Sequence, residues 1–147
     1  GMIIVHYPKP DFKTKSKGEK KFIFDPLRKK WIVLTPEEWV RQNFVQYLLQ
    51  EKNYPAALIA LEKEIQLGEL KKRFDLLVYD SDHRPWMLIE CKAMDVKLDD
   101  AVLEQIIRYH AAVPVSYLII TNGKSCFGFS KKSGTLVPIY EMPEHSN

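Results

Sequence analysis

An acid and a base stand two residues apart at the end of an apolar run. The segment PWMLIECK contains Glu90 and Lys92 directly after Met87, Leu88 and Ile89. Ionised groups are costly to bury unless they are paired or bind a metal. Residues two apart in a strand point to the same face of a sheet. We therefore expect Glu90 and Lys92 to share a face of the sheet, where they either pair with each other or serve a chemical function.

A second acid, Asp75, belongs to the preceding apolar segment, KRFDLLVYD. If the two segments pair as a hairpin across DSDHRP, Asp75 and Glu90 fall close together. Two neighbouring carboxylates repel each other, and a divalent cation relieves the repulsion. Oxygen ligands are those that Mg²⁺ prefers, and an adjacent lysine supplies positive charge for a phosphate. The three residues therefore predict phosphate chemistry at a metal, with a structural ion pair of Glu90 and Lys92 as the alternative.

The surrounding sequence predicts one α/β domain that could position these residues. Thr35 and Pro36 are typical of a helix start, Asp99 or Asp100 of a second one, and Asn122-Gly123 of a type I′ hairpin. The predicted order is a helix, three strands, a helix, a strand and a hairpin. The expected helices are 35–53 and 98–113, and the expected strands are 57–67, 72–80, 86–93, 115–121, 124–129 and 136–140.

Length and composition are consistent with a single domain. The chain has 147 residues, 46% of them hydrophobic, and no window approaches the roughly 20 apolar residues of a membrane helix. We expect a loose arm or short hairpin over 1–30, with the arm over 1–20 and a hairpin turn at Asp25-Pro26. The domain is expected over 31–142 and a polar tail over 143–147. The N-terminus lacks a signal-peptide pattern, so the cytoplasm is the expected location. Cys91 and Cys126 are expected to be small buried hydrophobes.

The ordered segments resemble the PD-(D/E)xK nuclease superfamily, and most closely the nuclease domain at the N-terminus of type I restriction enzyme R subunits. Asp75 followed by Glu90-Cys91-Lys92 matches the motif, and TPEEWVRQNFVQYLL, LEQIIRY and LIITNG match the segments around it. The resemblance implies a restriction-endonuclease-like αβββαβ core, with a mixed central sheet flanked by helices and a C-terminal hairpin. It implies a metal-dependent endonuclease that hydrolyses phosphodiester bonds in nucleic acid, with DNA as the expected substrate.

The resemblance also implies residue roles. Asp75, Glu90 and the backbone carbonyl of Cys91 would bind Mg²⁺, for which Mn²⁺ could substitute. Lys92 would activate water and stabilise the transition state. Glu38 matches an additional acid near the metal, and Gln105 with Tyr109 matches a supporting Q-x-x-x-Y element.

Several of these roles have plainer alternatives. Thr35-x-x-Glu38 is also a capping box, in which Glu38 serves only the helix N-terminus. Gln105 could make ordinary hydrogen bonds, although its neighbours predict that it points inward with Leu98, Val102 and Tyr109. Glu62 is expected to be a plain edge-strand acid, and His110 a helix-surface residue.

Phe74 stands where the motif has proline, and the 147 residues include no helicase motor. The alternative function is a catalytically silent module on the same fold that binds nucleic acid or assists assembly. The net charge of +3 permits a nucleic-acid partner, and basic clusters such as Lys13–Lys21 could contact phosphates. A homodimer, or a separate motor or specificity subunit, is also compatible with the resemblance. No membrane partner is expected.

Overall fold

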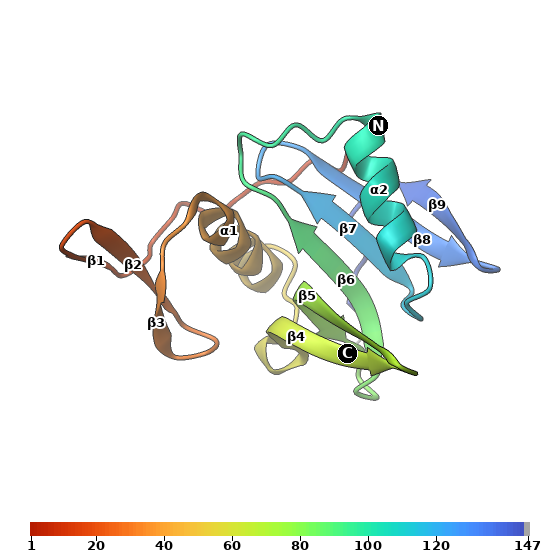
Figure 1. Cartoon of the computed structure of the whole chain (residues 1–147), viewed down its shortest axis with the longest axis horizontal. Helices are drawn as coiled ribbons and strands as arrows, with labels where there is room; N and C mark the ends of the chain where they lie inside the picture. The colour runs from red at the N-terminus through yellow and green to blue at the C-terminus, as the bar shows by residue number, and fades with distance from the viewer. Residues whose placement is uncertain (146–147) are drawn as a thin grey trace.

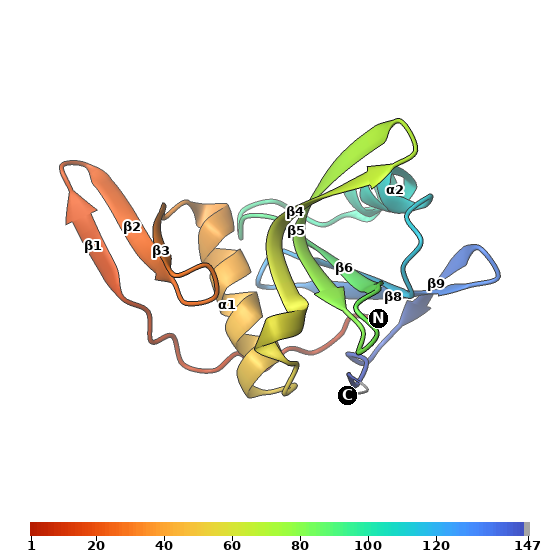
Figure 2. The same cartoon turned by 90° about the horizontal axis from the view of Figure 1, so that it is seen from below.

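The computed structural model describes residues 1–145. Over that range it contains two α-helices, one short 3-10 helix and two separate β-sheets. Figure 1 and Figure 2 show how these elements are arranged. The N-terminal sheet consists of β1 (Thr14–Lys17), β2 (Lys20–Asp25) and β3 (Lys30–Val33). The large sheet consists of β4 (Ile59–Leu67), β5 (Leu70–Tyr79), β6 (Pro85–Cys91), β7 (Tyr117–Thr121), β8 (Cys126–Lys132) and β9 (Thr135–Ile139). The helices are α1 (Pro36–Gln50), η1 (Ala56–Leu58) and α2 (Asp100–His110).

The large sheet is mixed, and its strands lie side by side in chain order from β4 to β9. β4, β5 and β6 pair antiparallel, whereas β7 runs parallel to β6 after the crossover through α2. A parallel neighbour needs such a crossover, and a helix usually supplies it. β8 and β9 then form an antiparallel hairpin. The predicted element order, the mixed sheet and the C-terminal hairpin are therefore confirmed.

Both helices begin at the residues that the sequence indicates. The Thr35 hydroxyl accepts the backbone N–H of Glu38 at 3.0 Å, and Pro36 opens α1. The Asp99 carboxylate accepts the backbone N–H of Val102 at 2.9 Å. Each cap satisfies a backbone donor that has no partner within the helix.

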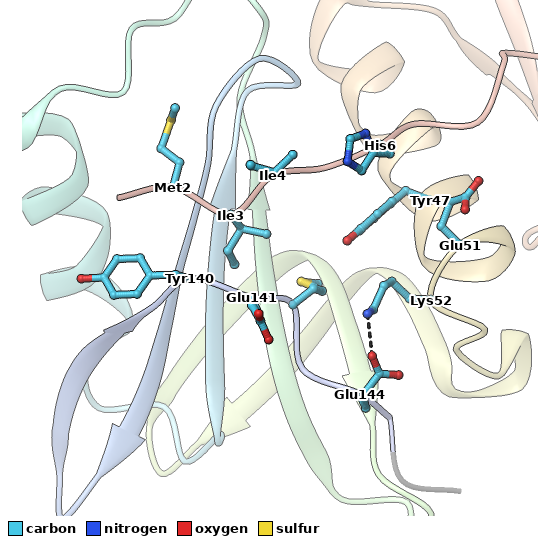
Figure 3. A pocket seen from close by; sticks show the side chains of 11 residues that line it. Met2, Ile3, Ile4, His6, Tyr47, Glu51, Lys52, Tyr140, Glu141 and Glu144 are labelled. Carbon is cyan, nitrogen blue, oxygen red and sulfur yellow. Dashed lines mark hydrogen bonds and ion pairs between the residues drawn. The ribbon is translucent and has the colours of Figure 1, made fainter.

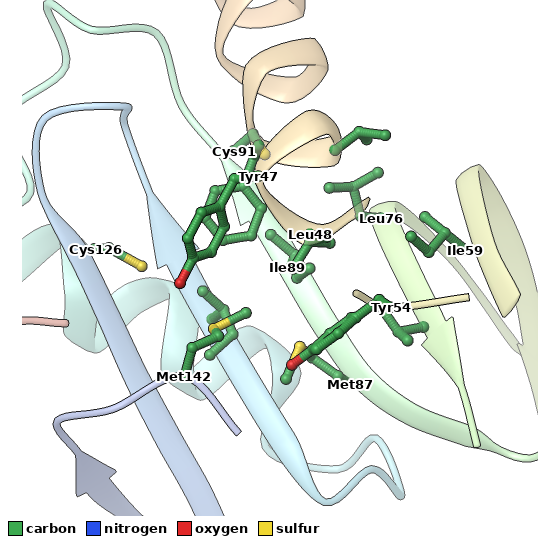
Figure 4. Close-up of a cluster of buried hydrophobic side chains, with 14 of the residues drawn as sticks. Tyr47, Leu48, Tyr54, Ile59, Leu76, Met87, Ile89, Cys91, Cys126 and Met142 are labelled. Atoms are coloured by element: carbon green, nitrogen blue, oxygen red, sulfur yellow. The ribbon is translucent and has the colours of Figure 1, made fainter. Parts of the chain in front are cut away.

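The helices cover opposite faces of the large sheet. α1 packs through Phe44 and Leu48 on a core that includes Ile89 and Cys91, which Figure 4 shows in part. α2 packs on the core at the opposite face, which includes Leu88. The alternation along β6 therefore follows the two-residue period of a strand. Glu90 follows Leu88 in that alternation, as the sequence predicts.

The N-terminal segment is more ordered than the sequence indicates. The hairpin around Asp25-Pro26 is confirmed as β2 and β3, but the loose arm predicted for residues 1–20 is wrong at Thr14–Lys17, which forms β1. Ile3 is buried, and its N–H donates to the Cys126 carbonyl at 2.8 Å. The pairing of Ile3 with Cys126 is distant in sequence and leaves no local pattern, and β1 is exposed throughout, so it lacks the apolar alternation that would reveal a strand. α1 lies between the two sheets in both views (Figure 1, Figure 2).

The loop after β7 is a hairpin of a different type from the one predicted. A type I′ turn needs positive φ at both central residues, but of Asn122 and Gly123 only Gly123 has it, at φ 88°. The Asn122 carboxamide oxygen instead accepts the N–H groups of Lys124 and Ser125 at 2.9 and 2.8 Å. Its amide nitrogen donates to the Val96 carbonyl at 2.8 Å. Asn122 therefore ties the hairpin to the segment after β6.

The two edge strands of the large sheet are irregular or lack a donor. In β4, Leu61 pairs with Leu76 and Lys63 with Phe74, while Glu62 between them has a positive φ of 51°. In β9, Pro138 is exposed and has no backbone N–H. Of the tail predicted over 143–147, residues 146 and 147 lie outside the described residues. Among the residues described, no helix has the length and apolarity to cross a membrane.

Candidate active site

The pairing of β5 with β6 brings Asp75 next to the end of β6. Leu76 pairs with Ile89, so Asp75 precedes this pair on β5 while Glu90 follows it on β6. The backbone N–H of Cys91 donates to Asp75 Oδ2 at 2.8 Å. The hairpin pairing that the sequence predicts across residues 80–85 is therefore confirmed. Neighbouring antiparallel strands hold these two acids at the same level of the sheet.

The surroundings of Asp75 make its carboxyl group harder to ionise than an exposed aspartate. Burial and the negative charge of Glu90 raise its pKa from the ordinary 3.8 to about 7. Glu37 on α1 acts in the same direction, while the Cys91 N–H and Arg41 act against it. Arg41 Nη1 lies 3.6 Å from Asp75 Oδ1. A divalent cation at this position would favour the ionised form of Asp75.

Glu90 lies between two basic side chains. Lys92 Nζ is 3.5 Å from Glu90 Oε1, and His110 Nε2 is 3.7 Å from Glu90 Oε2. The N–H of Lys92 donates to the Thr121 carbonyl at 2.8 Å, which fixes the backbone beside β7. Glu90 and Lys92 thus share a face, as the two-residue period predicts.

His110 is a contact of Glu90 that the sequence did not reveal. The prediction of a helix-surface residue is wrong, because His110 is buried and its ring packs on Phe74 with centroids 5.5 Å apart. The four-residue spacing from Ile106, the other buried residue of α2, was the available signal.

A group of charged and polar side chains joins α1 to both sheets. We call it the ionic cluster. Arg41 lies at its centre, with Nε 3.1 Å from Glu38 Oε2 and Nη2 3.2 Å from Glu62 Oε1. Arg28 adds a contact of 3.2 Å from Nη1 to Glu62 Oε2. The members of the ionic cluster are Asp25, Arg28, Glu38, Arg41, Gln42 and Glu62.

Glu38 belongs to the ionic cluster and lies beside, rather than within, the Asp75–Glu90 pair. Its carboxylate accepts from Arg41 and, at 3.0 Å, from Gln42 Nε2. The capping role of Thr35 is confirmed, but the Glu38 carboxylate turns to these side chains and not back to the helix N-terminus. Because Arg41 contacts both Glu38 and Asp75, it bridges the additional acid to the site.

Asp25 is the most completely satisfied acid of the ionic cluster. Its Oδ1 accepts the N–H groups of Leu27 and Arg28 at 2.8 and 2.9 Å, and its Oδ2 accepts Arg28 Nε at 2.6 Å and Gln42 Nε2 at 3.1 Å. Burial alone would raise its pKa, but these donors outweigh burial and hold the pKa of Asp25 below 3.8. The side chain is therefore a charged anchor of the β2–β3 turn.

Glu62 is more than the plain edge-strand acid that the sequence predicts. Partial burial would raise its pKa, but the charges of Arg41 and Arg28 and a hydrogen bond from Arg41 lower it. Arg73 adds a contact of 3.3 Å. The positive φ of Glu62 aims this carboxylate from the sheet edge toward the arginines, at a backbone conformation that is unusual for glutamate.

Gln105 and Tyr109 do not point inward as predicted. Both are exposed, Tyr109 at 54%, while the buried residues of α2 are Ile106 and His110. The sequence prediction placed the apolar stripe about one residue from its observed position. Tyr109 meets Lys72 of β5, whose ammonium lies 4.3 Å from the ring centroid and also bonds the Tyr109 carbonyl.

Two pockets lie near these elements, and the lining of neither includes Asp75, Glu90 or Lys92. A pocket of about 600 Å³ opens beside the ionic cluster, lined by Glu37, Glu38, Arg41 and Glu62 among others. A different pocket of about 510 Å³ lies between the N-terminal segment, Tyr47 and the C-terminal segment, where Lys52 pairs with Glu144 at 2.7 Å (Figure 3). The lining of the second pocket includes none of the predicted site residues.

Few side chains are available as metal ligands. Within residues 1–145, no group of three or more His, Cys, Asp or Glu side chains is arranged to hold a metal ion. Asp75 and Glu90 supply two carboxylates, and the strand end adds backbone carbonyls. Mg²⁺ is commonly bound by one or two carboxylates together with waters and substrate phosphates. Two carboxylates and backbone carbonyls are oxygen ligands of the kind that Mg²⁺ prefers.

Comparison with known proteins identifies a family for most of the chain. No curated protein matches the chain. A family model described as type I restriction enzyme R protein N terminus matches residues 36–143, from the first residue of α1 to beyond β9. The match includes Asp75, Glu90 and Lys92, and it begins after the N-terminal sheet. The chain therefore belongs to the family of type I restriction enzyme R protein N-terminal domains.

Proposed function

We propose that this chain is a metal-dependent endonuclease domain that hydrolyses phosphodiester bonds in DNA. The observation that carries the proposal is the meeting of Asp75, in the middle of β5, with Glu90 and Lys92 at the end of β6. The element order from α1 to β7 agrees with the αβββαβ core of PD-(D/E)xK nucleases, which the sequence resembles. Restriction enzymes act on DNA, so family membership favours DNA as substrate.

Asp75, Glu90 and the Cys91 backbone carbonyl would hold Mg²⁺, with Mn²⁺ as a substitute. When bound, the ion would supply Lewis-acid stabilisation of the phosphate and a more acidic water. The raised pKa of Asp75 supports this assignment, because burial and the neighbouring negative charge of Glu90 make Asp75 harder to ionise without a cation. The Cys91 N–H would orient Asp75 through the hydrogen bond to Oδ2.

Lys92 would act on the substrate side of the site. Its ammonium is 3.5 Å from Glu90 and the side chain is one third exposed, so Lys92 is oriented by the protein yet accessible to a ligand. A positive charge held there would stabilise negative charge as it develops on the phosphate, and it would orient the attacking water. Glu38, through Arg41, would be a positioning residue for Asp75.

The test is nicking of supercoiled plasmid in Mg²⁺ or Mn²⁺. Lys92→Ala and Glu90→Ala should each lower the nicking rate by roughly 10² or more. The first removes the positive charge that would act on the reacting phosphate, and the second removes a carboxylate that would bind the metal. Lys97→Ala and Glu104→Ala are matched controls, since both side chains are exposed and lie outside the site. Equal nicking by the wild type and all variants would identify a contaminant and overturn the proposal.

A second candidate is a catalytically silent module that binds nucleic acid or assists assembly. It is favoured by Arg41, which already brings a fixed positive charge within 3.6 Å of Asp75. A site that needs no metal should gain no stability from one, whereas a metal site should. Thermal unfolding with and without Mn²⁺ therefore separates the candidates. Absence of both nicking and metal stabilisation would favour the silent module.

A further inference from the structure

One face of the N-terminal sheet combines lysines with aromatic rings. Lys15 pairs with Phe22, and Phe24 pairs with Trp31, so these side chains share a face. The opposite face turns toward α1, because Asp25 accepts from Gln42 there. We call the side away from α1 the outer face. Its members include Lys15, Lys17, Lys20, Phe22, Phe24 and Trp31.

The rings of the outer face are held in place and only partly covered. The Phe24 and Trp31 rings meet edge to face with centroids 5.4 Å apart. Lys15 Nζ lies 4.3 Å from the Trp31 ring centroid. Trp31 nevertheless remains 38% exposed, and Lys15 is exposed as well. A large aromatic ring left in contact with water on a small sheet is a stacking surface for a ligand.

The outer face belongs to the most basic part of the chain. Residues 13–31 contain eight Lys and Arg against two Asp and Glu, a net charge of +6. The whole chain carries +3, so the remaining residues together carry −3. The positive charge is therefore concentrated on the N-terminal sheet. Its complement is a polyanion.

The N-terminal sheet is also fixed beside the candidate active site. Arg28, at the β2–β3 turn, contacts Glu62 of β4, and Asp25 contacts Gln42 of α1. Arg41 in the same ionic cluster contacts Asp75. β3 ends two residues before the Thr35 cap of α1. A nucleic acid held by this sheet would therefore be tethered close to the site.

We propose that the outer face binds single-stranded DNA, with Trp31 stacking on a base and Lys15, Lys17 and Lys20 contacting phosphates. Single-stranded nucleic acid is recognised by aromatic rings set among cationic groups, because unpaired bases expose their faces. Bases within a duplex stack on each other and offer no face to Trp31. The choice of DNA over RNA rests on the proposed function, whereas binding itself needs no cleavage and no metal. The face lies outside the part of the chain that the family model matches.

The test is fluorescence anisotropy of labelled oligo-dT of about 20 nucleotides, in EDTA, against the same length of duplex and of oligo-U. Trp31→Leu should weaken oligo-dT binding roughly tenfold and leave duplex binding unchanged. The double variant Lys15→Ala/Lys20→Ala should lower the dependence of log K on log salt by about 0.7 per lost phosphate contact. Lys21→Ala/Lys30→Ala removes the same charge from the opposite side of the same sheet, and it should have a much smaller effect.

The lysine variants keep the test independent of the folding of Trp31→Leu, because their side chains are exposed. Equal losses from the two lysine pairs would mean that charge alone attracts DNA, which overturns the assignment to the outer face. Duplex binding as tight as oligo-dT binding, with no effect of Trp31→Leu, overturns the single-stranded assignment. Tighter binding of oligo-U overturns the choice of DNA. Since EDTA prevents metal chemistry, failure here is distinct from failure of the nicking assay.

Discussion

The ionic cluster and the Asp75–Glu90 pair are neighbours, but the pKa values of their aspartates shift in opposite directions. Asp25 accepts four hydrogen bonds, two of them from Arg28 and Gln42 side chains, and its pKa is lowered. Asp75 accepts one hydrogen bond from a backbone N–H and faces another acid, and its pKa is raised to about 7. Both acids are largely buried, so the difference comes from their partners. Charge is balanced where the chain needs an anchor and left unbalanced where a ligand could supply the balance.

The largest expected effect is on the anchor. Asp25→Ala should destabilise the protein by about 3 kcal/mol at pH 7, because it removes one partner of a buried ion pair and takes the acceptor from Arg28 Nε and from the N–H groups of Leu27 and Arg28. Urea unfolding measures the loss. Asp82→Ala is the matched control, since its pair with Arg84 is exposed, and it should change stability by less than about 0.5 kcal/mol. Equal losses of stability in Asp25→Ala and Asp82→Ala would show that the buried ion pair of Asp25 stabilises the protein no more than an exposed one.

The next effect should have the opposite sign. Asp75→Asn should stabilise the metal-free protein by about 1–3 kcal/mol at pH 8, because it removes a carboxylate that folding makes harder to ionise. The amide oxygen can still accept the Cys91 N–H. The measurement is urea unfolding in EDTA. A loss of stability at pH 8 would mean that Asp75 is an anchor like Asp25.

The pH dependence sharpens the contrast between the two acids. The pKa of Asp75 is higher in the folded protein than its ordinary 3.8, so its contribution is most favourable below pH 4 and declines as the pH rises through about 7. The gain from Asp75→Asn should therefore disappear near pH 4. The pKa of Asp25 is lowered, so its stabilisation is complete above pH 4 and is lost as the pH falls further. Unfolding curves of both variants from pH 3 to 8 measure these differences.

A bound metal ion should offset the loss of stability that ionised Asp75 causes in the metal-free protein. With Mn²⁺ fixed at ten times the dissociation constant measured at pH 8, the wild type should gain about 1.4 kcal/mol at that pH. The gain should be larger at pH 8 than at pH 6, because ligand carboxylates must be deprotonated. Thermal unfolding at both pH values tests this. The same gain in Asp75→Asn would place the metal elsewhere.

The smallest effect concerns the exposed side of the ionic cluster. Glu62→Gln should cost about 0.5 kcal/mol at low salt and less at high salt, because this carboxylate is 38% exposed and solvent screens its pairs. Thermal unfolding at two salt concentrations measures the difference. A loss as large as that of Asp25→Ala would show that Glu62 is an anchor in spite of its exposure.

Much of the fold could be predicted because its signals are local. Thr35 and Asp99 mark the helix starts, and the alternation of β6 separates Leu88 from Ile89. The site trio also has a local origin, since strand period and hairpin pairing bring Asp75 toward Glu90. These signals need only the neighbours along the chain.

The rest depends on contacts between distant segments. Nothing near Asp25 reveals Gln42 as its partner, and nothing near Ile3 reveals Cys126. The orientation of α2 was missed because a shift of one residue moves Gln105 from the predicted inner stripe to the surface and brings His110 into the core. Only the packed sheet determines which side of such a helix is buried.

The irregular edges of the large sheet also bear on self-association. An exposed strand edge can template the addition of another chain, which leads to aggregation. Glu62, with its left-handed backbone and its charge, interrupts the edge at β4, and Pro138 removes a donor from the edge at β9. Edge-to-edge pairing of the large sheets of two copies is therefore disfavoured at both edge strands, β4 and β9. Copies of this chain that assemble without aggregating would meet through helices, loops or the N-terminal sheet.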